Sequence, residues 1–191
     1  QAVQALTGYE REEAEWLLKY LELHEQRIKE LKGKIQEEAK NDEDMKRLQS
    51  IPGVGPIVAY AFTAHVGDGS RFSKGAQVSN YIVGFVPRLD YSGTIQRHGH
   101  ITKRGNGYLR GLLVQAAWSM TLSKKGGALC TRYKYYTLCQ EASKKKTIVS
   151  IGRKLAELMY SILRNKTTYE LRKWDGPKGK LVISTGQTMC A

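Results

Sequence analysis

Acidic residues are scarce in this chain after residue 50. Residues 51–191 contain 22 Lys and Arg but only 6 Asp and Glu, a formal balance of +16, whereas residues 1–50 contain 9 and 12, a balance of −3. A positive surplus of this size attracts polyanions, and nucleic acid is the commonest of them. The cations lie among glycines and aromatics, not along one amphipathic helix, which disfavours an acidic membrane surface. We therefore expect a nucleic-acid partner.

Long apolar runs, paired cysteines and familiar hydrolase or nucleotide motifs are also missing. No run of about 18 apolar residues exists, so no membrane span is expected. Cys130, Cys139 and Cys190 lack metal-like spacing, and the first two would lie on opposite sides of a helix, so we expect reduced thiols in the cytoplasm. The chain has no Gly-x-Ser-x-Gly and no P-loop lysine. It shows no secretory signal at its start. It begins at Gln1 and not at a methionine, so we expect a segment of a longer protein.

Residues 9–40 have the pattern of one long helix. Glu, Lys and Arg crowd most positions, while an apolar seam steps by four and three residues, as in a coiled coil. The seam consists of Leu17, Leu21, His24, Ile28, Leu31 and Ile35. This pattern predicts a coiled-coil arm that joins two chains into a homo-oligomer. A helical hairpin packed on its own domain and an amphipathic helix lying on the core are the alternatives.

A tight glycine turn follows the arm. Gly53-Val54-Gly55 is preceded by apolar residues at helical spacing and followed by Pro56, which suits the first turn of a helix that Gly67 can end. This pattern is typical of a helix-hairpin-helix, whose glycines let the backbone approach a phosphate and whose second helix directs its first amides at it. Gly53, Val54 and Gly55 are therefore candidate DNA-binding residues. An ordinary turn between two packed helices is the alternative.

The remainder of the chain also predicts helices. We expect a short helix after Ser73 with Ala76, Val78, Tyr81 and Ile82 facing inward, a helix capped by Asn106, and two helices over about 128–141 and 147–165. No strand is firmly indicated, and residues 86–105 are expected to form the largest irregular loop. The expected fold is mainly α. It comprises a helical arm over 1–44, a compact helical domain over 45–175 and a flexible tail over 176–191.

The expected loop contains an isolated serine in a basic setting. Ser92 precedes Gly93, which would leave its hydroxyl uncrowded. A serine that attacks a phosphodiester needs cations around the phosphoryl oxygens, often with metal ions sharing that load. The residues placed for that role, which are also candidate DNA contacts, are Arg97, Lys103, Arg104 and Arg110. A turn serine in a DNA-binding loop is the plainer alternative, and His98 and His100 fit phosphate contacts better than metal ligands.

These elements together resemble a known family. The matching stretches are "IPGVGPIVA", "FSKGAQVSNYIVGFVPR", "SG", "GHITKRGNGYLRGLLVQAA" and "IGRKLAELMYSILRNKTTY", in the family's order and spacing over about residues 45–170. The chain resembles the C-terminal half of the serine transposases of bacterial insertion sequences related to the Piv DNA invertase, the group called bridge recombinases. The preceding coiled-coil segment fits the link from another domain.

The resemblance implies a function and a nucleophile. In that family the serine of the Ser-Gly element joins DNA covalently, which carries over to Ser92. The active site is completed by a RuvC-like domain, outside this chain, whose four carboxylates bind Mg²⁺; no cofactor or metal site is expected in this chain itself. The family often has Ser-Ser-Gly, whereas Tyr91 precedes Ser92 here, which leaves the tyrosine as a rival hydroxyl. A structured guide RNA and a bacterial cytoplasmic, nucleoid-associated location are also implied.

Two other functions remain open on the sequence. In one, the chain is a non-catalytic helix-hairpin-helix module that binds DNA, and Ser92 is structural. In the other, it is an RNA-associated basic protein, which explains the charge but not the Ser-Gly element. If the composite site is right, the chain alone should bind nucleic acid with a steep salt dependence and be nearly inactive as a recombinase.

Overall fold

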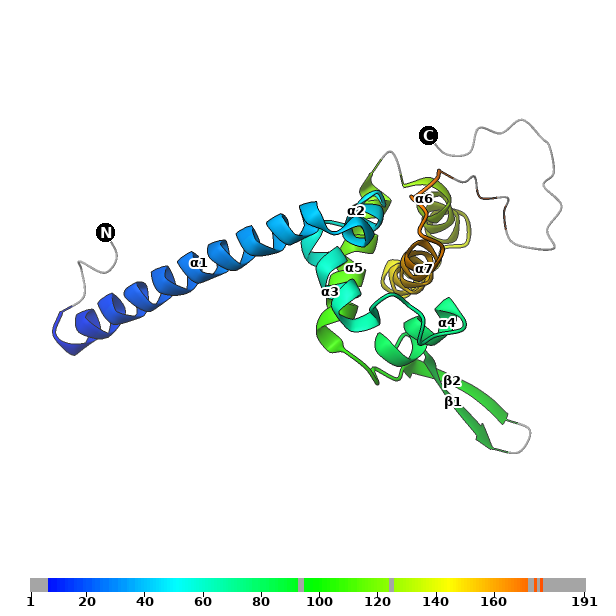
Figure 1. The fold of residues 1–191 in the computed structure, drawn as a ribbon. Coiled ribbons are helices and arrows are strands. Elements are labelled where there is room, and N and C mark those ends of the chain that lie inside the picture. The colour runs from blue at the N-terminus through cyan, green and yellow to red at the C-terminus, as the bar shows by residue number, and fades with distance from the viewer. Residues whose placement is uncertain (1–6, 93–94, 124–125, 172–173, 175, 177–191) are drawn as a thin grey trace.

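A computed structural model of the chain shows a mainly helical fold, as expected (Figure 1). The structure describes residues 7–92, 95–123, 126–171, 174 and 176, except for the side chains of residues 90–98. The helices are α1 (Tyr9–Asn41), α2 (Glu43–Gln49), α3 (Pro56–Val66), α4 (Gly75–Gln77), α5 (Gly107–Leu122), α6 (Gly127–Lys134) and α7 (Lys144–Asn165). Two π-helical turns, η2 (Val78–Ile82) and η3 (Tyr135–Cys139), and two strands, β1 (Pro87–Ser92) and β2 (Ile95–Ile101), complete the described elements.

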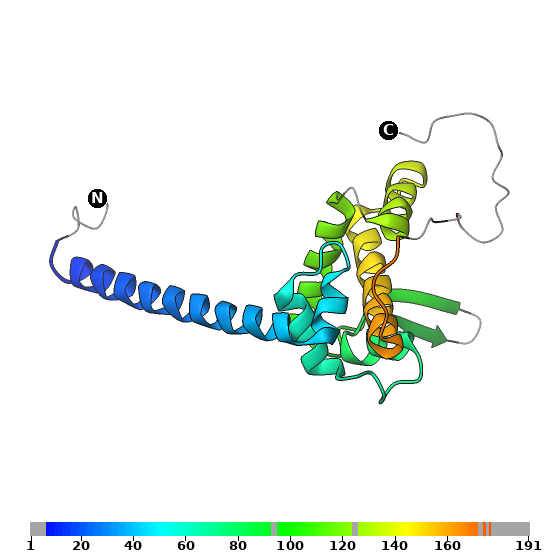
Figure 2. The ribbon, with the colours of Figure 1, turned by 45° about the horizontal axis from the view of Figure 1, so that its top comes forward.

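Helix α1 is an arm that leaves the rest of the fold at its C-terminal end (Figures 1 and 2). At about 1.5 Å per residue, its 33 residues extend for about 50 Å. The seam residues Leu17, Leu21, Ile28 and Leu31 are 45–54 % exposed, and burial begins only near Ala39, where α1 contacts α2 and α3. The expectation of one long helix is confirmed. The alternative in which it lies on the core is wrong, because the helix has no described neighbour over most of its length.

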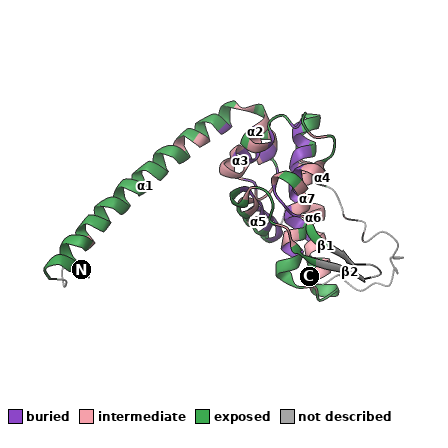
Figure 3. Ribbon diagram, turned by 90° about the horizontal axis from the view of Figure 1, so that it is seen from below, coloured by how far each residue is buried: buried purple, intermediate pink, exposed green. Residues whose placement is uncertain are grey.

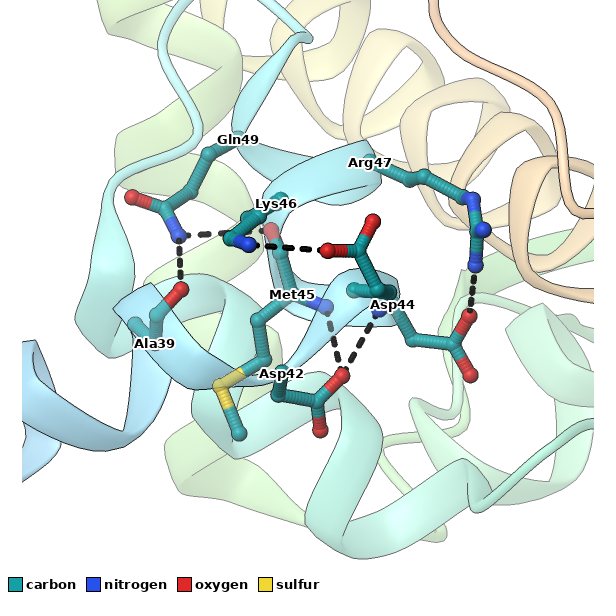
Figure 4. Close-up of polar contacts among 8 residues, drawn as sticks. Ala39, Asp42, Asp44, Met45, Lys46, Arg47 and Gln49 are labelled. Atoms are coloured by element: carbon teal, nitrogen blue, oxygen red, sulfur yellow. Dashed lines mark hydrogen bonds and ion pairs between the residues drawn. The ribbon is translucent and has the colours of Figure 1, made fainter.

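Side-chain caps fix the junction between the arm and the body (Figure 4). Asp42 ends α1 and caps α2, since its Oδ1 accepts the amides of Asp44 at 2.7 Å and Met45 at 3.2 Å. Gln49 Nε2 reaches back to the carbonyl oxygens of Ala39 at 3.5 Å and Met45 at 3.3 Å. A single non-helical residue thus separates the two helices, and the turn is held by hydrogen bonds from both sides.

The core lies among α2, α3, α5 and α7, with α5 and α7 packed along one another (Figure 3). Apolar residues at helical spacing supply it, as the sequence pattern predicts. Its largest fully buried side chains include Leu48, Phe62, Leu109, Leu113, Met120, Ile151, Leu155, Met159 and Leu163. Gly152 lets α7 pass close to Phe85, whose ring would lie 3.3 Å from a Cβ at that position. The chain leading to the strands is therefore anchored on the core helices.

The expected helix after Ser73 is only partly correct. A three-residue helix passes at once into η2, where Val83 N–H donates to Val78 O in the i→i+5 pattern of a π-helix. This wider turn shifts the angular positions of the side chains that follow. Tyr81 is consequently 74 % exposed instead of facing inward, whereas Val78 is fully buried as expected.

Residues 86–105 are not the irregular loop expected from the sequence. β1 and β2 form an antiparallel hairpin in which Leu89 pairs with His98 and Ser92 with Ile95, with a bulge between Pro87 and Leu89. The strands project away from the helical body (Figures 1 and 2), and residues 87–89 and 99–100, whose side chains are described, are exposed. β1, PRLDYS, alternates apolar and polar residues, but β2, IQRHGHI, does not, so the two segments together give no consistent sequence signal for a strand pair.

No helix among the described residues is long and apolar enough to cross a membrane, in agreement with the sequence. Cys130 is buried and Cys139 is exposed, and both are free thiols, which confirms that they do not pair with each other. Within the same described ranges, no group of three His, Cys, Asp or Glu side chains could hold a metal ion. The expected tail over 176–191 lies almost entirely outside the described residues.

Candidate functional site

Ser92 is the last residue of β1, at the outer end of the hairpin. Its backbone pairs with Ile95 across the two-residue link, and Tyr91 pairs with Gln96. The side chains of Tyr91, Ser92 and Arg97 lie outside the described part of the structure, so their predicted roles stay predictions. The structure adds that the serine stands on a paired strand and not within a long irregular loop.

Hydrogen bonds hold the root of the hairpin to the helical body. Thr102 N–H donates to Val86 O at 2.7 Å, where the two strands leave the body, and Asn106 N–H donates to Ile82 O at 2.8 Å. Arg110 then reaches back from α5, and its Nη1 donates to Val83 O at 2.9 Å and to Lys103 O at 3.4 Å. The segments entering and leaving the hairpin are therefore tied both to each other and to α5. We call this region, residues 82–86 and 101–106 with Arg110, the hairpin root.

Two glycines allow the backbones of the root to approach this closely. Gly84 has φ +78°, and a Cβ there would lie 2.1 Å from Arg104 O. Gly105 has φ +126°, and a Cβ there would lie 2.7 Å from Ile82 O. Both positions combine a backbone conformation that favours glycine with a space that admits no side chain. The "VGF" and "RGN" stretches are thus two halves of one backbone contact.

Asn106 connects the root to α5 and α3. Its Oδ1 accepts the amide of Leu109 at 3.0 Å and caps α5, as the sequence predicts. Its Nδ2 donates to His65 Nε2. His65 Nδ1 lies 2.8 Å from Ala61 O and must donate to it, because a carbonyl only accepts; the other ring nitrogen is then free to accept from Asn106. The sequence pattern places His65 only on a helix face and carries no signal for this contact.

The predicted DNA-contact cations fall into two classes. Lys103 and Arg104 are exposed at the root, and Lys103 adopts a left-handed conformation with φ +56°. Arg110 is half-buried, and its guanidinium group already binds two carbonyl oxygens of the root. The geometry therefore gives Arg110 a structural role, and Lys103 and Arg104 are the members of this set whose described side chains face solvent.

The Gly53-Val54-Gly55 turn joins α2 to α3, and its three residues differ in role. Gly53 has φ +87°, and a Cβ there would lie 2.7 Å from both Ala116 O and Met120 N, so this glycine is needed for packing against α5. Val54 is buried. Gly55 is the N-cap of α3, has open space around it and gives no side-chain cap to the first amides of the helix. A phosphate contact at this turn, still a prediction, would therefore centre on Gly55 and the first turn of α3.

Comparison with known proteins relates part of this sequence to a family. Residues 45–134, which include most of α2 and all of α3, the hairpin, its root, α5 and α6, match the transposase IS116/IS110/IS902 family. Residues 45–134 are therefore similar to a domain of this family. The most distinctive stretch of the sequence, "ITKRGNGYLR", lies inside the matched range and builds the hairpin root.

Individual relatives agree with the assignment to the IS116/IS110/IS902 family. The chain is 32 % identical over 149 residues to a probable family 20 transposase of Pseudomonas aeruginosa, covering 78 % of this chain and 44 % of that protein. It is 34 % identical over 131 residues to the transposase for insertion sequence element IS1111A of Coxiella burnetii, covering 69 % and 36 %. A pilin gene-inverting protein of Moraxella bovis is 27 % identical over 128 residues, covering 65 % and 38 %. The chain thus spans less than half the length of these relatives.

Proposed function

We propose that this chain supplies the DNA-binding and nucleophile-bearing half of a transposase or site-specific recombinase. The Ser92 hydroxyl attacks a DNA phosphodiester, an oxygen–phosphorus bond to the serine forms, and the bond from phosphorus to one sugar oxygen breaks. In net terms, the proton lost by the serine hydroxyl passes to the departing sugar oxygen. Attack by a different strand's hydroxyl reverses the step and releases the serine. One phosphodiester replaces another, so rejoining requires no external energy source.

The observation that carries this proposal is the clamped hairpin. Catalysis by positioning requires the reacting atom to be held in a defined place relative to its substrate. A serine at the end of a paired strand, whose root is fixed by glycine contacts and by Arg110, is held on a more defined support than a loop offers. The family match adds transposases as relatives that contain the same segment.

The proposed active site is composite. The family resemblance implies a RuvC-like domain with four carboxylates, which would bind Mg²⁺ and so supply positive charge at the reacting phosphate. From this chain, Lys103 and Arg104 at the root, with Arg97 on β2, would contact phosphates and orient the strand. A structured guide RNA is part of the same proposal, and the surplus of +16 charges over residues 51–191 suits either nucleic acid.

The test of this proposal is to trap and map the covalent intermediate. A full-length protein carrying this segment is incubated with its guide RNA and a DNA containing the recombination site, denatured, and digested for mass spectrometry. We expect a DNA adduct on Ser92. An adduct on Tyr91 would keep the reaction class and replace the nucleophile. Strand exchange without any adduct would contradict covalent serine catalysis.

A non-catalytic DNA-binding module is the second candidate, favoured by the turn between α2 and α3. The first amides of α3 have no side-chain cap from Gly55, and Pro56 occupies the first position. A helix start of this kind is suited to a phosphate, as in a helix-hairpin-helix. Under this alternative Ser92 is only a turn-proximal strand residue, and its replacement would leave strand exchange unchanged.

We also propose that two copies pair through α1. Four apolar seam residues are about half exposed on a helix that has no described neighbour over most of its length, and such a stripe gains stability by packing against a second one. Leu21→Glu is expected to convert the dimer of this chain to a monomer in analytical ultracentrifugation. Leu23→Glu is the matched control, since Leu23 is 61 % exposed but lies off the seam. Equal behaviour of the two variants, or a monomeric parent chain, would contradict pairing along the seam.

A further inference from the structure

Two exposed tyrosines flank the hairpin root. Among the described residues outside α1, the aromatic side chains with the greatest exposure are Tyr81 at 74 % and Tyr108 at 65 %. Tyr81 belongs to η2, which leads into β1, and Tyr108 lies in the first turn of α5, which follows β2. They are far apart in sequence, and they belong to the two segments that the root joins.

The backbone contacts bring these two positions to the same region. Tyr81 O would lie 3.0 Å from a Cβ at Gly105, and the next carbonyl, that of Ile82, accepts the Asn106 amide. Tyr108 follows Asn106 by two residues. The exposed cations Lys103 and Arg104 precede Gly105 on the same segment. Aromatic and cationic side chains are therefore gathered at one root.

Neither ring has a specific partner among the described residues. Within the described residues, neither Tyr81 nor Tyr108 has a ring contact or a hydrogen bond to its hydroxyl group, in contrast to Tyr160, whose O–H donates to Phe72 O, and to Tyr133, which contacts Trp118. Both rings are largely in water, where a large apolar face gains nothing from packing. No packing contact among the described residues explains why an aromatic side chain stands at either position.

We propose that Tyr81 and Tyr108 stack on unpaired bases of a nucleic-acid strand that crosses the hairpin root, while Lys103 and Arg104 contact its phosphates. Exchange of strands requires base pairs beside the cut to open, which exposes base faces to water. Aromatic rings receive such faces without regard to base identity, and neighbouring cations follow the backbone. The inference deepens the proposed function, because it names the state of the substrate that this surface binds: a single-stranded segment, of DNA or RNA.

The test measures binding by the 191-residue chain without any cleavage step. Fluorescence anisotropy would compare a single-stranded DNA, a single-stranded RNA and a duplex of the same sequence, and 2-aminopurine in the single strands would report stacking. We expect Tyr81→Ala and Tyr108→Ala to weaken single-strand binding roughly 5- to 150-fold, the range for loss of one stacked base, and to change duplex binding much less. A loss on either DNA or RNA supports the proposal, and its size on each identifies the source of the strand.

Matched variants separate stacking from other effects. Tyr81→Phe and Tyr108→Phe keep the ring and should bind within about twofold of the parent chain if stacking is responsible. Tyr9→Ala removes a side chain that is 78 % exposed at the far end of α1 and should have no effect. Lys103→Ala should weaken single-strand and duplex binding alike. The proposal would be overturned if the alanine variants lost as much affinity for the duplex as for the single strand. It would also be overturned if the phenylalanine variants lost as much affinity as the alanine variants.

The outcome is independent of the nucleophile. Because the assay contains no strand transfer, single-strand binding through these tyrosines can be present even where no Ser92 adduct forms. The converse result is an adduct on Ser92 while the alanine variants bind single strands normally. That result would reject the stacking proposal and leave the proposed nucleophile in place. Circular dichroism melting of each variant guards against unfolding, which is not expected from residues so exposed.

Discussion

Replacing Ser92 by alanine is expected to abolish strand exchange in the full-length protein and leave DNA affinity nearly unchanged. Removing a nucleophile eliminates the covalent route itself, so the loss should be about 10⁴-fold or more, the scale seen when a catalytic serine is removed. One small side chain at the end of a projecting strand contributes little to folding or to phosphate binding. The measurement is the rate of recombinant product formation, with electrophoretic mobility shift for DNA affinity.

Tyr91→Phe is the control for this variant. It removes the rival hydroxyl from the neighbouring position and keeps the ring, so strand exchange should continue within about threefold of the parent rate if Ser92 is the nucleophile. If Tyr91→Phe abolishes strand exchange and Ser92→Ala does not, Tyr91 is the nucleophile. Normal exchange by both single variants would support the non-catalytic module.

Gly84→Ala is expected to destabilise the domain by about 3 kcal/mol, because it combines backbone strain with a collision between two main chains. The added methyl group would lie 2.1 Å from Arg104 O at a residue with φ +78°. Neither group is the end of a flexible side chain that could turn away. For a chain of this size, a loss of about 3 kcal/mol lowers the melting temperature by roughly 6–12 °C, which differential scanning calorimetry measures directly.

Gly111→Ala provides the comparison for this substitution. Gly111 is exposed on α5, and an added methyl group there would have nothing within 4 Å, so alanine should raise stability by up to about 1 kcal/mol through its better helix propensity. If the Gly84→Ala protein has the same melting temperature as the parent chain, the two backbone segments of the hairpin root can move apart at little cost. Ser92 would then not be rigidly held.

Local sequence signals predicted the elements that depend on local interactions. The long helix of α1, the Asn106 cap of α5 and the apolar stripe of α7 follow from periodicity and capping chemistry, and the structure confirms each. The family resemblance rests on the same stretch that now forms the root, and its coarse part, transposase relatives with pilin-inverting homologues, is confirmed. The serine chemistry and the guide RNA stay predictions.

The errors concern features set by contacts between distant residues. The hairpin was missed because its pairing joins residues across a turn, and because β2 shows no period of two to match the short alternation in β1. The hydrogen bonds from Arg110 to Val83 O and Lys103 O could not be predicted either, because the sequence does not bring these groups near it; its predicted phosphate contact stays a prediction. Tyr81 was placed inward because a π-helical turn cannot be recognised from an α-helical period.

The single-residue junction at Asp42 constrains the length of α1. The helix α1 is continuous and is hydrogen-bonded to the body at Ala39 and Asp42. Each of its residues therefore contributes to the distance between the body and the far end of the arm, and to the rotation of the body about the helix axis. Removing one residue from the arm would turn the body by about 100° about the helix axis relative to a partner paired at the seam. Removing seven would draw it in by about 10 Å with little rotation. If two copies pair along the seam as proposed, the arm would set their spacing, so that deletions of seven residues would be tolerated and deletions of one residue would misdirect the hairpin.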